Sequence, residues 1–355
     1  MEEKVASKCQ SCGSELYFNP EGGNLKCKAC GTAVEFEKSS SFDRRTIDME
    51  TLATIGDKLD ESRISMSHCS SCGAAFTGTL VTLSTKCQYC GGNMVVDDTA
   101  AHPDGCLPFA FGKEQASVKF AEEIKKKFFV PKAFKKNPKT DSIDSIYIPA
   151  FSYSSKIEAA YAGELYETYT DSDGDSHTRH FNVRGTEYAD MRDVLVECSD
   201  YLTQSELKQI EPYYMNETKK FSQGFVYGYS VEYYNRSVED SAKLAREIMQ
   251  NRVREQILKR YDHDGVDYLD VKHKYQNSTY SYLLLPTYRV KFKYKNKDYS
   301  AVMNGQTGKI GGKLPSSPWR VVWIVIAILA FFAIIAGIMF SGAAEDITQY
   351  IEFDF

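Results

Sequence analysis

The stretch Lys8–Gly31, "KCQSCGSELYFNPEGGNLKCKACG", holds two Cys-x-x-Cys pairs that are separated by fourteen residues. A Cys-x-x-Cys turn points both sulfurs at one tetrahedral metal ion, and an arm of this length returns the chain as a hairpin. Glycine follows each pair, and its freedom to adopt positive φ lets amide hydrogens turn toward the thiolates. The pattern predicts a zinc ribbon with four ligands: Cys9, Cys12, Cys27 and Cys30.

A second stretch, His68–Gly92, repeats both the spacing and the glycines, as "HCSSCGAAFTGTLVTLSTKCQYCGG". Each site offers four thiolates and leaves no open position, so we expect two structural zinc ions rather than a catalytic metal. Iron in a rubredoxin-like centre is the alternative for such soft ligands. The predicted ligands of this second ribbon are Cys69, Cys72, Cys87 and Cys90.

The charge of the chain argues against a nucleic-acid binder. The formal net charge is −5, from 43 basic and 48 acidic residues. Neither ribbon has a basic face, whereas phosphate contacts dominate nucleic-acid affinity. Aromatic residues of the ribbons, such as Tyr17, Phe18 and Tyr89, either stack bases or fill hairpin cores, and we favour core filling.

One apolar segment predicts a membrane span. The stretch 321–344, "VVWIVIAILAFFAIIAGIMFSGAA", contains no charged residue and is long enough to cross a bilayer as a helix. Trp319 and Trp323 lie at its N-terminal edge, where interfacial aromatic residues are common. Basic residues precede the span and only acids follow it, so the positive-inside rule places the N-terminal side in the cytoplasm and a short tail outside. A reducing cytoplasm also favours metal binding over disulfides in the cysteine pairs.

The segment between the second ribbon and the span predicts an α+β domain with an antiparallel sheet. Helices are expected over 113–129 and 237–261, and alternating strands follow each of them. Pro149 and Pro286 occupy similar places after the two helices, so the domain is a candidate for a duplicated unit. The expected organisation is ribbon 1 over 1–38, a partly helical linker over 39–65, ribbon 2 over 66–98, the α+β domain over 105–313, a transmembrane helix over 319–342 and an acidic extracytoplasmic tail over 343–355.

Two other segments suggest surface contacts. The stretch 125–136, "KKKFFVPKAFKK", interleaves phenylalanines with six lysines, and it is either a solvated helix end or a patch for an anionic membrane surface. A stripe of small residues with a spacing of four is a candidate for helix–helix packing, although it fits a lipid-facing surface equally well. The lysines are Lys125, Lys126, Lys127, Lys132, Lys135 and Lys136, and the stripe is Ala333, Gly337 and Ser341.

We find no catalytic constellation in the sequence. The acidic stretch 171–180, "DSDGDSHTRH", lacks the order of an EF-hand and is expected to be a hairpin turn. The stretch 304–313, "NGQTGKIGGK", lacks the spacing of a phosphate-binding loop and is also expected to be a β-hairpin. We therefore predict no enzymatic activity and no small-molecule substrate.

The whole pattern resembles a family of bacterial membrane proteins with TFIIB-type zinc ribbons. The resemblance rests on the paired CxxCG ribbons, on the stretches "LPFAFGKEQA", "FFVPKAF", "YIPAFSY" and "NGQTGKIGG", and on the terminal span. Within it, the chain is most similar to the zinc-ribbon membrane protein encoded beside phage-shock-protein-A-like and SPFH (flotillin-like) proteins in Gram-positive bacteria. The resemblance implies an envelope-stress role and offers no catalytic residues, and only the eight cysteines carry over.

The expected function is a single-pass adaptor of the cell membrane. It would bind partner proteins at the cytoplasmic face and recruit an SPFH-like protein, with the bilayer and other membrane proteins as partners. The alternative is a membrane-tethered zinc-ribbon protein that binds nucleic acid or has a regulatory role.

Overall fold

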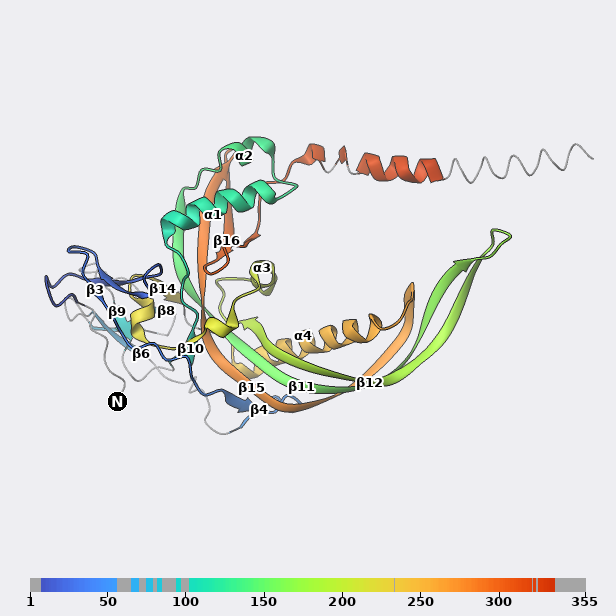
Figure 1. The fold of residues 1–355 in the computed structure, drawn as a ribbon, viewed down its shortest axis with the longest axis horizontal. Helices are drawn as coiled ribbons and strands as arrows, with labels where there is room; N and C mark the ends of the chain where they lie inside the picture. Colours follow the sequence, from blue (N-terminus) through green and yellow to red (C-terminus); the bar gives the residue numbers. More distant parts are fainter. Residues whose placement is uncertain are drawn as a thin grey trace, which may run out of the picture.

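The computed structural model describes residues 8–55 and 102–335, apart from 233, 321 and 324, and the backbone of four short strands between residues 65 and 96. Within these residues the chain forms a small N-terminal hairpin sheet, a large mainly antiparallel sheet with helices on both faces, and one exposed apolar helix (Figure 1).

The N-terminal part contains only short strands. They are β1 (Leu16–Asn19), β2 (Asn24–Cys27), β3 (Ala33–Val34), β4 (Arg45–Ile47), β5 (Thr54–Ile55), β6 (Ser65–Cys69), β7 (Ala75–Gly78), β8 (Thr82–Ser84) and β9 (Met94–Val96). The described part of the expected linker, residues 39–55, holds β4 and β5 and no helix, which differs from the partly helical expectation. This segment forms a strand because it pairs with a part of the chain that is distant in sequence. β4 joins the large sheet through Thr46, which lies opposite Thr279.

Three strands dominate the large sheet. They are β11 (Ser142–Thr170), β12 (Ser176–Glu197) and β15 (Gly265–Tyr294). β11 lies between the other two and pairs antiparallel with both, which forms the long curved arm of Figure 1. The shorter members are β10 (Gly105–Cys106), β13 (Lys219–Lys220), β14 (Ser230–Glu232), β16 (Lys297–Asn304) and β17 (Ile310–Gly312).

Helices cover both faces of the sheet where it is widest. They are α1 (Lys113–Lys126), α2 (Lys132–Lys136), α3 (Gln204–Ile210) and α4 (Val238–Leu258), with the 3-10 turns η1 (Met215–Glu217) and η2 (Gln223–Val226). Residues 145–151 of β11 are all buried, as expected for a strand that is covered on both sides. Buried aromatic residues such as Tyr147 and Phe151 belong to one core cluster, and aliphatic residues such as Ile148 belong to the other, which contains α3.

The outer half of the arm is covered on one face only. Ile157, Ala159 and Tyr161 of β11 are buried, and they share a core cluster with Val253 and Ile257 of α4. The residues between them on β11 are exposed or half-buried, which is the period-two pattern of a sheet with one solvated face.

A helical segment, a long strand and a second strand follow one another twice, as α1–α2–β11–β12 and as α4–β15–β16, and the first series contains one helix more. The two long strands lie antiparallel, so that Pro149 faces Leu284 and Pro286 faces Tyr147. That the domain is a duplicated unit remains a prediction.

The C-terminal described segment is one apolar helix. Its window Pro318–Ile335 has a mean hydropathy of 2.3, and none of it is buried within the described structure. This helix is long and apolar enough to cross a membrane. The remainder of the predicted span and the acidic tail lie outside the described residues.

Candidate metal centre

The first ribbon is a hairpin whose two strands place the cysteine pairs at one end. β1 and β2 pair antiparallel, with Leu16 opposite Cys27. Leu16, Phe18 and Leu25 are buried, so alternate residues of both strands form a small apolar core. The first cysteine pair precedes β1, and the second begins at the last residue of β2.

Four sulfurs converge at this end of the hairpin. The Sγ atoms of Cys9, Cys12, Cys27 and Cys30 all lie within 4.8 Å of one another. The measured separations are 3.6 Å for Cys9–Cys30, 3.4 Å for Cys12–Cys27 and 3.5 Å for Cys12–Cys30. A tetrahedral ion with bonds of about 2.3 Å to sulfur requires separations of roughly 3.8 Å, so this set fits one metal ion.

The two glycines and the local amides behave as the sequence predicts. Gly13 and Gly31 have φ of 70° and 75°, and their amides donate to the carbonyls of Cys9 and Cys27. Backbone amides donate to the sulfurs and lower the pKa of two thiols, mainly through Cys12 for Cys9 and through Cys30 for Cys27. Thiolates are the ligand form, so these amides favour metal binding.

The other two thiols have pKa values that shift in opposite directions. The side-chain hydroxyl of Thr32 is the main cause that lowers the pKa of Cys30. For Cys12, the Ser14 amide lowers the pKa, but the neighbouring sulfurs of Cys27 and Cys30 outweigh it and raise the pKa to about 12. The neighbouring thiols thus oppose the ionisation of Cys12. A cation placed among the four sulfurs would favour ionisation.

A metal ion held in this centre would have a structural role. Four thiolates complete a tetrahedral set, and no position remains for a water or a substrate. The second predicted set lies outside this description, because Cys72, Cys87 and Cys90 are not among the described residues and Cys69 is described only as the end of β6. The prediction of two zinc ions therefore remains a prediction.

The first ribbon is docked on the large domain, which the sequence did not reveal. The Phe18 ring meets Phe225 of η2 edge to face at 5.4 Å between centroids, and Phe36 meets the same ring at 5.0 Å. The Phe18 amide also donates to the carbonyl of Tyr227 at 2.9 Å. Phe18 is fully buried, so the prediction that this aromatic residue fills a core is confirmed.

A glycine of the domain lets the ribbon approach closely. Gly228 has φ of 88°, and a Cβ atom there would lie 2.9 Å from the Cβ of Tyr17. The end of the ribbon with Cys12 and Cys30 remains exposed. The backbone of β8, from the second ribbon segment, pairs with the neighbouring strand β14, so both ribbon segments meet the domain around residues 223–232.

The predicted lysine patch separates into two groups. Lys127 donates to the carbonyl of Ile310 and Lys135 to that of Lys125, while Lys126 pairs with Glu123. Burial, with Arg320 as a second cause, lowers the pKa of Lys135. The other three lysines, Lys125, Lys132 and Lys136, are exposed and make no ion pair within the described residues.

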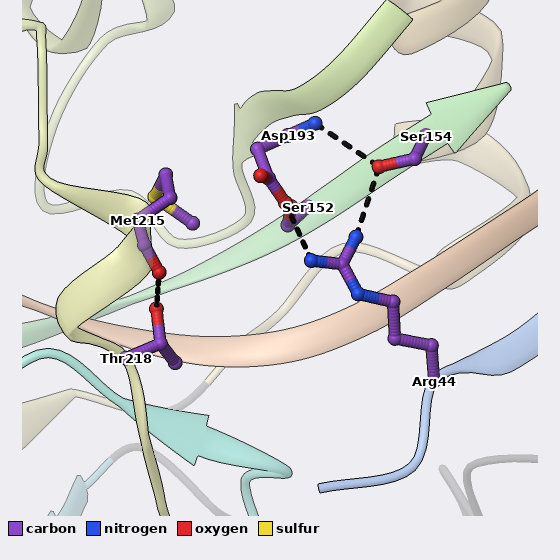
Figure 2. A network of polar contacts seen from close by, with 6 residues as sticks. All are labelled: Arg44, Ser152, Ser154, Asp193, Met215 and Thr218. Carbon is purple, nitrogen blue, oxygen red and sulfur yellow. Dashed lines mark hydrogen bonds and ion pairs between the residues drawn. The ribbon is translucent and has the colours of Figure 1, made fainter. Parts of the chain in front are cut away.

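A second polar site fastens the chain after the first ribbon to a kink in the sheet (Figure 2). The guanidinium of Arg44 donates to Ser154 Oγ and to an oxygen of Asp193, each at 2.9 Å, and Ser152 Oγ donates to the same carboxylate oxygen. β11 changes register against both neighbours between residues 153 and 156, and Asp193 has φ of 50°. A pocket of about 330 Å³ opens beside these residues and reaches Lys156 and the Arg192–Asp190 ion pair.

The acids in this pocket already have cationic partners, since Arg44 pairs with Asp193 and Arg192 with Asp190. The arrangement therefore holds the N-terminal segment against the bulge. Sequence reasoning missed it because Arg44 and Asp193 are distant in the chain.

Two predicted turns are confirmed. Residues 171–175 connect β11 to β12, with Thr170 opposite Ser176, and the Asp171 carboxylate accepts from His177 and from backbone amides. Asn304 and Lys309 close the turn between β16 and β17 through a backbone hydrogen bond. Of the small-residue stripe, Ala333 lies exposed on the apolar helix, and Gly337 and Ser341 lie outside the described residues.

Comparison with known proteins finds one relative to report. The chain is similar to a Bacillus subtilis (strain 168) protein described as "Uncharacterized protein YdjG", with 27% identity over 341 residues that make up 94% of each chain. No protein-family profile matches the chain. No solved structure matches it.

Proposed function

We propose that this protein is a membrane-anchored zinc-ribbon adaptor that is not an enzyme and binds partner proteins at the cytoplasmic face of the cell membrane. One observation carries the proposal: a four-cysteine centre is docked on a large sheet domain whose chain continues into an exposed apolar helix. A closed metal site and a long platform serve binding rather than bond chemistry.

Zinc is the metal that we assign to the centre. Four thiolates at tetrahedral spacing suit zinc, and a hairpin of this size needs the metal for its folding energy. The second cysteine set repeats the spacing and the glycines of the first, which supports a second zinc ion.

The helix supports anchoring, and its flanks support the orientation. Lys309, Lys313 and Arg320 precede the uncharged stretch that begins at residue 321, and the segment after the apolar stretch carries only acids. The positive-inside rule then places the domain in the cytoplasm.

For the partner, we propose an SPFH (flotillin-like) protein that is recruited in an envelope-stress response. The support is the resemblance to the zinc-ribbon membrane proteins encoded beside such partners. The first ribbon packs Phe18 and Phe36 against its own domain, and we propose its exposed metal end and the second ribbon as the surfaces that bind the partner.

The experiment is co-purification in detergent with a co-expressed SPFH-like protein. Cys69→Ser/Cys72→Ser should lose the partner, whereas Ser71→Ala, in the same turn but not a ligand, should keep it. The variant Cys9→Ser/Cys12→Ser tests separately whether the first ribbon contributes to partner binding. If all variants retain the partner at the wild-type level, the ribbons are not the docking modules.

The rival function, nucleic-acid binding, has its own readout. Salt-dependent binding of DNA or RNA by the full chain in detergent, with affinity falling steeply as salt rises, would favour it. We expect no such binding, because the basic and acidic residues of the chain nearly balance.

A further inference from the structure

The loop between α1 and α2 is fixed to the start of the apolar helix. The Ser317 amide donates to the carbonyl of Phe129 at 2.8 Å, and the Arg320 guanidinium donates to the carbonyl of Phe128. The same guanidinium lies 5.1 Å from the centroid of the Phe128 ring. Figure 1 shows α1, α2 and the beginning of the red helix at one end of the molecule. The loop therefore lies close to the surface of any bilayer that the helix enters.

Two aromatic rings of this loop are exposed. Phe128 is 61% exposed and Phe129 is 48% exposed, and the rings meet edge to face at 5.4 Å between centroids. Trp319 and Trp323 are exposed at the start of the helix. Adjacent exposed aromatic rings are costly in water but are typical of the interface between headgroups and acyl chains.

Lysines from a distant part of the chain join this end. The Phe134 ring of α2 stacks on Phe292 at 5.0 Å and meets Tyr294 at 5.5 Å, which brings the β15–β16 turn beside α2. Lys295 and Lys297 in and after this turn are exposed. We call the basic face the six exposed lysines at this end that form no ion pair within the described residues: Lys125, Lys132, Lys136, Lys139, Lys295 and Lys297.

Three acidic residues at the same end pair with other lysines, and two more, Glu122 and Asp141, are exposed without an ion pair within the described residues. Asp144 pairs with Lys291 at 3.1 Å, and Asp298 pairs with Lys293 at 3.5 Å. Glu123 pairs with Lys126. The six lysines of the basic face outnumber these two unpaired acids, so the face keeps a net positive charge.

We propose that the basic face lies on the anionic surface of a lipid bilayer, with Phe128 and Phe129 inserted at the level of the headgroups. The inference rests on the proposed membrane anchoring, and it adds a second contact that orients the domain on the bilayer. Lysines near an anionic leaflet attract its headgroups, and neighbouring aromatic rings add apolar burial. A hinged domain joined to the membrane by the helix alone would leave both rings in water.

Single-tryptophan reporters test the two contacts separately, because the full chain has only two tryptophans. Phe129→Trp in a Trp319→Phe/Trp323→Phe background reports on the loop. Trp319→Phe alone leaves Trp323 to report on the helix. The chains are reconstituted in phosphatidylcholine vesicles with or without phosphatidylglycerol, and the lipids carry bromine on the acyl chain as a quencher.

We expect the Phe129→Trp indole to emit at shorter wavelength and to be quenched several-fold more in vesicles with phosphatidylglycerol than a Tyr188→Trp control. Tyr188 is 72% exposed on β12, at the arm of the sheet. Replacing Lys132, Lys136, Lys295 and Lys297 with Gln should reduce this quenching to the level in phosphatidylcholine. The control Lys272→Gln/Lys274→Gln, on the arm of β15, should leave it unchanged.

Quenching of Trp323 shows whether the helix enters the bilayer. Quenching of the indole at position 129 shows whether the basic face contacts lipid. If Trp323 is quenched and the Phe129→Trp indole is quenched no more than the Tyr188→Trp control, the basic face does not touch lipid and the inference is wrong. If Trp323 is not quenched, the proposed anchoring fails, whatever the loop reports.

Discussion

At the scale of single residues, the glycines after the cysteine pairs illustrate what a sequence predicts well. Their role depends only on their own φ angles and on amides one or two residues away. The sequence pattern therefore predicted the positive φ at Gly13 and Gly31 and the amides that face the sulfurs. The same pattern around Gly73 and Gly91 lies outside the described residues.

Gly31→Val should weaken metal retention by the first ribbon. A Cβ atom at this position would meet nothing within 4 Å, so the cost is backbone strain at φ of 75° and not a clash. That strain is about 1 kcal/mol, or roughly fivefold in affinity. Competition with a chromophoric chelator measures it. Gly31→Asn is the control, because asparagine tolerates this conformation, and an equal loss in both variants would contradict the argument.

Glu197 should make the stability of the domain depend on pH. Burial raises the pKa of this carboxyl to about 7, although it accepts hydrogen bonds from the amide and hydroxyl of Ser199. The unfolded chain has a pKa of about 4.3 here, so between these values the folded state holds more protons. Stability therefore falls as pH rises through this window, and the loss is complete above about pH 7.

Glu197→Gln should remove that dependence. The amide oxygen still accepts from Ser199, and nothing titrates. Between about pH 6 and pH 8 the wild type should lose on the order of 1 kcal/mol relative to the variant. Thermal unfolding in detergent with excess zinc measures the difference between the two chains. Parallel curves for both chains would show that Glu197 does not titrate in this window.

At the scale of elements, the sequence predicted those whose pattern is local. The helix expected over 237–261 is observed as α4, and its Ser237 side chain accepts from the Asp240 amide as an N-cap. The turn at Lys295 and Asn296, both with positive φ, also depends on local sequence, because asparagine tolerates this conformation. The first half of β15 was missed, because residues 265–278 are mostly polar and gain their structure by pairing with β11.

The docking of the first ribbon depends on one ring. Phe225 is fully buried and touches Phe18 and Phe36 of the ribbon. Phe225→Ala should cost about 3 kcal/mol and release the ribbon from η2, whereas Phe225→Leu should cost less. Limited proteolysis between residues 37 and 44 measures the release. Unchanged cleavage in the alanine variant would show that the ribbon is held in another way.

At the scale of the whole molecule, the domain and the ribbons should respond differently to loss of metal. Most of the buried residues in the two core clusters come from the large domain, whereas the first ribbon adds only Cys9, Leu16, Phe18, Leu25 and Cys27. A hairpin of this size does not bury enough surface to fold alone.

Elemental analysis of the purified chain should therefore find two zinc ions per chain, and Cys9→Ser/Cys12→Ser should reduce the number to one. Circular dichroism should show that the strand signal of this variant is retained. One zinc ion in the wild type would mean that the second cysteine set does not bind metal. Loss of the strand signal would mean that the first ribbon is required for folding of the domain.

The central place of β15 in the sheet also has a consequence for the order of synthesis. β15 pairs with β4, β10, β11 and β16, so strands made early remain without their neighbour until late in translation. The first ribbon can bind its metal long before η2 exists to receive it. Only a few residues separate β17 from the apolar helix, so the sheet should close only as that helix leaves the ribosome.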